Sequence, residues 1–71
     1  MKTLNANYSR NVEILKENLK RGMSAEMANR AIDSMENQFK NSNLYNESEQ
    51  DFVSQMRATV IEHFTHISVT V

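Results

Sequence analysis

The chain has 71 residues, eight Lys or Arg against nine Asp or Glu, one Gly, and neither Cys nor Pro. This composition excludes disulfides and thiolate metal sites, and it disfavours a many-stranded fold, which would need more turn residues. A domain of this size buries only about 60% of the surface that its unfolded chain exposes. Self-association or docking on a partner protein is therefore the expected source of additional burial.

The hydropathy pattern favours a soluble protein. Residues 1–5 lack the apolar core of a signal peptide, and no apolar run approaches the ~20 residues of a membrane span. The absence of Cys suits a reducing compartment, so a cytoplasmic location is expected. Nine Asn residues are typical of bacterial or phage sequences of AT-rich origin.

Charge is distributed unevenly along the chain. Residues 1–21 contain five basic and two acidic residues, a net charge of +3, whereas residues 41–71 contain one basic and four acidic residues, a net charge of −3. These segments could attract each other within one copy or between copies, or they could simply be solvated faces.

A first helix is predicted over residues 5–21. Apolar residues recur there at helical spacing. The charged residues are assigned to the opposite, solvated side: Arg10, Glu13, Lys16, Glu17, Lys20 and Arg21. The apolar stripe comprises Leu4, Tyr8, Val12, Leu15 and Leu19. Beside it lies an uncharged flank, which we call the amide flank: Asn7, Asn11, Ile14 and Asn18. Because interface cores are depleted of charge, the amide flank is a candidate protein-binding surface. The alternative is that Asn is simply common in this chain.

A tight turn around Gly22 is predicted to end the first helix. Lys20 and Arg21 suit the negative end of a helix dipole, Gly22 can adopt a positive φ, and Ser24 can cap the next helix. The second helix is predicted over residues 25–39, with its apolar face formed by Ala28, Ala31, Ile32, Met35 and Phe39. We expect the first two helices to pack on each other as a helical hairpin.

A third helix is predicted over residues 49–65, after a loop at 40–48. Ser48 and Asp51 have the spacing of a capping box. The apolar stripe of this helix runs from Phe52 to Ile67, and Ile61 points away from it. Residues 66–71 then alternate polar and apolar side chains, which predicts a frayed tail or, less often, a short strand that pairs with another chain.

The segment from Glu62 to His66 is the one cluster with residue types that suit catalysis or metal binding. His63 and His66 could share a metal, but a zinc site needs a third ligand, and Glu62 lies well round the helix. His63 is therefore expected at a core edge or an interface. The sequence contains no nucleophile motif, phosphate loop or paired carboxylates. We predict no enzyme activity, no catalytic residue, no cofactor and no metal.

Together these patterns predict one all-α domain over residues 1–71, a three-helix mini-domain made of a helical hairpin, a third helix and a short C-terminal tail, possibly strand-like. The expected function is non-catalytic regulation through binding another protein, as an inhibitor, adaptor or connector, with the protein itself a homodimer. The candidate contact residues are Asn7, Asn11, Ile14, Asn18, Ile61 and His63.

Two other classes of function are kept as alternatives. A small transcription factor could use Lys16, Lys20 and Arg21 of the basic first helix on DNA, although the second helix carries too many acidic residues to read a groove. An oligomer could enclose a small ligand between its chains. Membrane association is not expected, because acidic residues interrupt the cationic face of the first helix.

Overall fold

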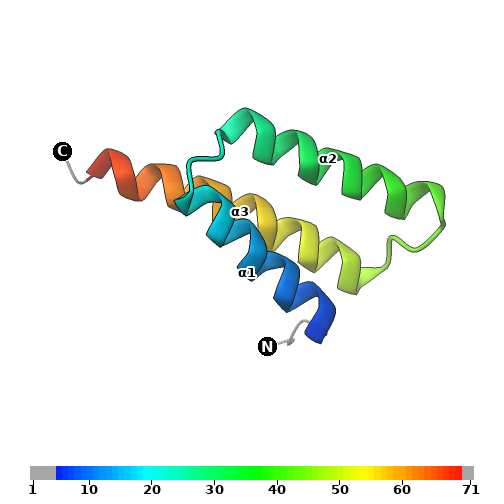
Figure 1. Ribbon diagram of the computed structural model, residues 1–71. Helices are drawn as coiled ribbons and strands as arrows, with labels where there is room; N and C mark the ends of the chain where they lie inside the picture. The colour runs from blue at the N-terminus through cyan, green and yellow to red at the C-terminus, as the bar shows by residue number, and fades with distance from the viewer. Residues whose placement is uncertain (1–4, 70–71) are drawn as a thin grey trace.

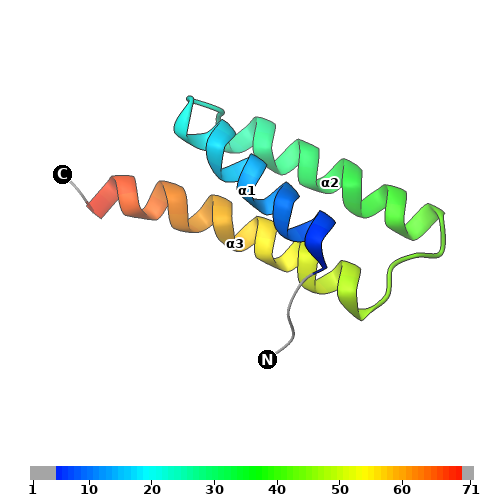
Figure 2. The same ribbon diagram turned by 60° about the horizontal axis from the view of Figure 1, so that its bottom comes forward.

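The structure, a computed structural model, describes residues 5–69 and gives side-chain surroundings for residues 5–65. It consists of α1 (Ala6–Lys20), α2 (Ala25–Asn41) and α3 (Glu47–Val69). Two views show α1 and α3 running in the same direction and α2 in the opposite one (Figure 1 and Figure 2). The predicted all-α fold of three helices is confirmed.

The central element of this bundle is α3, against which both other helices pack. Contact between α1 and α2 is much more limited, although a tight turn joins them. The expected hairpin packing is therefore replaced by packing through α3. The physical reason is the wide apolar face of α3, where Phe52, Val53, Met56 and Val60 are all buried and serve two neighbours at once. Ala31, which was expected in the α1–α2 contact, is exposed.

The core is formed by the predicted apolar stripes of the three helices. Its buried members are Val12, Leu15, Leu19, Ala28, Ile32, Phe52, Val53, Met56 and Val60. At one end, the ring of Tyr8 stacks on Phe52 with centroids 4.4 Å apart, and Phe39 meets both rings edge-on. This aromatic cluster joins all three helices, which fixes how they are aligned along their axes.

Two similar turns end α1 and α2. Gly22 has φ +110°, and the Met23 N–H donates to the Asn18 carbonyl oxygen at 3.0 Å. Asn43 has φ +59°, and the Leu44 N–H donates to the Phe39 carbonyl oxygen at 2.9 Å. Both are Schellman motifs, in which a residue with positive φ lets the chain turn back and satisfy the last carbonyls of a helix. After the first turn, Ser24 caps α2 as predicted, accepting from the Met27 N–H at 3.1 Å.

The ends of α3 differ from the prediction. The helix begins at Glu47, because Glu49 rather than Asp51 closes the capping arrangement: its Oε1 accepts from the Asn46 N–H at 3.1 Å. At the other end α3 continues to Val69, so residues 66–69 are helical where a tail was expected. A helix satisfies its backbone groups internally, whereas a strand would need a partner. Residues 70–71 of the predicted tail lie outside the described residues.

Candidate functional site

The three helices form a triangular bundle with three sides, and polar contacts close the side between α2 and α3. Arg57 on α3 donates to Asp33 at 2.8 Å and to Glu36 at 3.0 Å on α2. The Tyr45 hydroxyl also donates to Glu36, at 2.5 Å. The hydrogen bond from Tyr45, followed by that from Arg57, lowers the pKa of Glu36 despite partial desolvation. These groups satisfy one another, so this side offers little to a partner.

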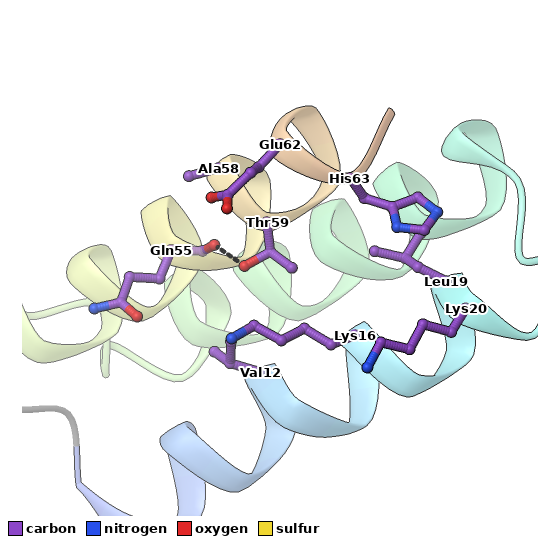
Figure 3. Close-up of a pocket in the computed structure, with 9 residues that line it drawn as sticks. All are labelled: Val12, Lys16, Leu19, Lys20, Gln55, Ala58, Thr59, Glu62 and His63. Carbon is purple, nitrogen blue, oxygen red and sulfur yellow. Dashed lines mark hydrogen bonds between the residues drawn. The ribbon is translucent and has the colours of Figure 1, made fainter. Parts of the chain in front are cut away.

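The side between α1 and α3 is an open groove of about 590 Å³ (Figure 3). Its lining residues are Val12, Lys16, Leu19, Lys20, Gln55, Ala58, Thr59, Glu62 and His63. Val12 and Leu19 belong to the buried core, so the groove has an apolar floor. The Thr59 hydroxyl donates to the Gln55 carbonyl oxygen at 2.7 Å, which satisfies it within the helix.

The walls of the groove carry opposite charges. Figure 3 shows Lys16 and Lys20 along the α1 wall, and Glu62 on the α3 wall. Lys16 pairs with Glu13 of its own helix at 3.2 Å. Within the described part of the chain, neither Lys20 nor Glu62 makes an ion pair. Two charges of opposite sign are thus available at the mouth of one groove.

The groove was not predicted from the sequence, because Lys16 and Lys20 were assigned to the solvated face of the first helix. Counting about 100° per residue, Lys16 and Lys20 lie only ~40° and ~80° from Val12, at the border of the apolar stripe. A cationic border beside an apolar stripe was the signal in the sequence that could have indicated a groove wall.

The third side, between α1 and α2, contains the amide flank. By the same count, Asn11 and Asn18 lie on the other side of the α1 stripe from Lys16 and Lys20. Ile14 is 49% exposed, and Asn18 is half-buried. Asn7 and Asn11 are exposed, and the Asn11 amide donates to the Asn7 carbonyl oxygen at 3.0 Å.

On α2, the edge away from Asp33 and Glu36 is also without charge. It carries Met27, which is 60% exposed, together with Ala31 and Ser34, which are exposed as well. We call this edge and the amide flank together the uncharged side. Only the α1 half of this side was predictable from the sequence, because the positions on α2 can be assigned to the same side only from the packing of the helices.

Ile61 and His63 do not belong to one surface. They are two residues apart on α3, hence about 200° apart around its axis. His63 is half-buried and lines the groove beside Lys20, with its ring 4.9 Å from that of Phe64. Ile61 is 66% exposed and lies one turn beyond Arg57, outside the groove. The six predicted residues are therefore spread over three regions of the molecule.

The described side chains contain no group of three His, Cys, Asp or Glu residues able to hold one metal ion. Glu62 and His63 both line the groove, whereas the side chain of His66 lies outside the described residues. Within the described residues, no helix is long and apolar enough to cross a membrane.

Comparisons with protein-family models, with curated proteins and with solved structures find no match to this chain.

Proposed function

We propose that this protein is a non-catalytic regulator that acts by binding another protein, as an inhibitor, adaptor or connector, and that it works as a homodimer. The observation that supports protein binding most is the uncharged side. Ile14 and Met27 there are 49% and 60% exposed, and the other residues assigned to this side, Asn7, Asn11, Asn18, Ala31 and Ser34, carry no charge.

The cost of desolvation makes an uncharged surface favourable for protein binding. A surface that loses water on binding is best made of apolar and uncharged groups, since an unpaired charge is costly to bury. Interface cores are accordingly depleted of charged residues. In this chain about a quarter of the residues are charged. An edge that combines two helices and avoids all of those charges is thus suited to contact with another protein.

The limited contact between α1 and α2 adds to this argument. Ile14 and Met27 come from different helices, so a partner that covers both would bury apolar surface that the monomer leaves in water. Burial contributes about 25 cal/mol per Å² of apolar surface. For a chain of marginal stability, binding on this side would therefore also strengthen the fold.

Photo-crosslinking in the native host tests this proposal. A photoreactive amino acid at Ile14 should give a discrete crosslinked protein that mass spectrometry can identify. The matched control places the same group at Ser54, an exposed position of α3 that lies ~160° around that helix from the buried Met56 and outside the uncharged side. Ile14→Asp in purified protein should then abolish binding to the identified partner while the circular dichroism spectrum is unchanged. No crosslink from Ile14, or the same products from both positions, would contradict the proposal.

A DNA-binding regulator is the second candidate. Lys16 and Lys20 lie together on one wall of an open groove, and such a pair can contact phosphates. Glu62 on the opposite wall works against this function, since it repels a phosphate backbone that approaches the groove. A third possibility, the binding of a small ligand between chains, has no observation in its favour beyond the groove itself.

A further inference from the structure

We infer that the α1–α3 groove is the surface through which two copies of this chain associate, with the two-fold axis running along the groove. In this arrangement Lys16 and Lys20 of each copy face Glu62 of the other. The inference rests on the proposed homodimer and goes beyond it, because it assigns the contact to one surface and one geometry. The uncharged side then remains free for an external partner.

The floor of the groove provides the apolar part of this contact. Val12 and Leu19 lie at its base, and Ala58 is an exposed small residue on the α3 wall. Small side chains allow another helix to approach closely, and side chains of one helix pack into the space between others. Two grooves placed face to face would bring four helices together and cover both floors.

The charges select the orientation of the two copies. Because α1 and α3 run in the same direction, Lys20 and Glu62 lie at the same end of the groove. A two-fold axis along the groove lays α1 of one copy on α3 of the other with equal ends together. Each such contact joins the lysine wall to the Glu62 wall, and symmetry makes it twice. An axis across the groove would instead place α1 on α1, where neither wall meets its opposite charge.

A second copy fits the groove better than a purely acidic or purely basic partner does. An acidic helix would be attracted by Lys16 and Lys20 but repelled by Glu62. A basic helix would be attracted by Glu62 but repelled by the two lysines. A second copy presents both signs in the required places. The charge distribution of the whole chain agrees, since residues 1–21 have a net charge of +3 and residues 41–71 have −3. Contact between the first segment of one copy and the last segment of the other is attractive.

Charge exchange at Lys20 and Glu62 tests the inference by sedimentation equilibrium. Lys20→Glu sets a new carboxylate of each copy against Glu62 of the other, and Glu62→Lys sets a new ammonium group against Lys20. Each single variant should therefore dimerise at least about tenfold more weakly than the wild type. An equimolar mixture of the two variants should restore dimers, because each copy then meets its opposite. The matched controls, Arg10→Glu and Glu17→Lys, change the same charges on the outer face of α1 and should dimerise as the wild type does.

The double variant Lys20→Glu/Glu62→Lys is the control that separates loss of association from loss of folding. It exchanges the charges at positions 20 and 62 within one chain and should form homodimers again, with the circular dichroism spectrum of the wild type. A folded double variant that stays monomeric would overturn the inference. So would single variants that dimerise as tightly as the wild type, which would place the dimer contact elsewhere and leave the proposed function standing. A monomeric wild type would overturn both the groove contact and the proposed homodimer, while the crosslinking at position 14 would still decide whether another protein binds.

Discussion

The hydroxyl of Tyr8 on α1 donates a 2.6 Å hydrogen bond to the carboxylate of Glu49 in the first turn of α3. Through its other oxygen, the same carboxylate accepts from the Asn46 N–H that begins the helix. One side chain thus both caps α3 and aligns α1 against it. The groove lies between the same two helices, towards their other end. The Tyr8–Glu49 hydrogen bond therefore helps to position both walls of the groove from a distance.

This contact predicts how stability depends on pH. The hydrogen bond from Tyr8 lowers the pKa of Glu49, with the Asn46 N–H contributing further. A carboxyl whose pKa is lower in the folded state stabilises the fold above its unfolded pKa of about 4.3, and this contribution is lost as pH falls through the folded pKa. Tyr8→Phe keeps the ring but removes the donor. We expect urea unfolding to show the variant less stable at neutral pH, with the difference in free energy of unfolding shrinking as pH falls below the unfolded pKa of Glu49.

A constant difference between Tyr8→Phe and the wild type over this pH range would contradict that prediction. It would mean that the variant acts through packing of the ring, which stacks on Phe52, rather than through the Glu49 carboxylate.

The hydrogen bonds around Arg57 predict which of two α2 carboxylates, Glu36 or Asp33, contributes more to stability. Glu36 accepts from both Arg57 and Tyr45 and its side chain is 22% exposed, whereas Asp33 accepts from Arg57 alone and is 61% exposed. Exposed ion pairs contribute little because water screens them. Glu36→Gln should therefore lower the free energy of unfolding more than Asp33→Asn in chemical denaturation. Equal effects, or the reverse order, would show that Tyr45 contributes nothing through Glu36.

Substitutions in the two Schellman turns are predicted to change the free energy of unfolding in opposite directions. Gly22 has φ +110° with open space around it, so Gly22→Ala meets no clash but places a Cβ on a strained backbone. It should lower the free energy of unfolding by about 1 kcal/mol. Asn43 has φ +59°, a conformation that Gly adopts more readily. Asn43→Gly should therefore raise the free energy of unfolding by about 0.5 kcal/mol. Thermal unfolding checks both values, and a stabilising Gly22→Ala would refute the assignment of that turn.

The DNA-binding alternative makes a prediction of its own. If the lysines of α1 bound phosphates, affinity for duplex DNA would fall steeply with salt concentration, and changing Lys16, Lys20 and Arg21 to Glu would abolish it. On the present proposal, electrophoretic mobility shifts at low salt should show no stable complex with the wild type. A complex that is lost both at high salt and in the triple variant would favour DNA binding over protein binding.

The fold was largely predictable because each helix is encoded by local signals. The apolar spacing around Val12, Leu15 and Leu19 and the cap at Ser24 depend on neighbouring residues alone, and the structure agrees with them. The ends of α3 were less predictable. Ser48 was the predicted cap, but the observed start involves the Asn46 N–H and Glu49, which also accepts from Tyr8 on a distant part of the chain.

The candidate site depended on packing, which the sequence does not contain. A helical wheel shows that Ile14 lies beside its stripe and that His63 lies on its own, but not which helix packs next to either residue. Once α3 is placed between α1 and α2, His63 falls in a groove with Lys20, and Ile61 falls outside it. The amide flank was found from sequence because it needs only one helix, whereas the α2 half of the uncharged side needed the arrangement of all three.

The mass of the wild-type protein in solution tests the central claim most directly. Sedimentation and light scattering over a wide range of protein concentration should give twice the mass of the chain, with dissociation promoted by high salt because Lys20 and Glu62 are exposed at the rim of the contact. A folded monomer at every concentration and at low salt would contradict the account, since the association proposed as its additional source of burial would then be absent.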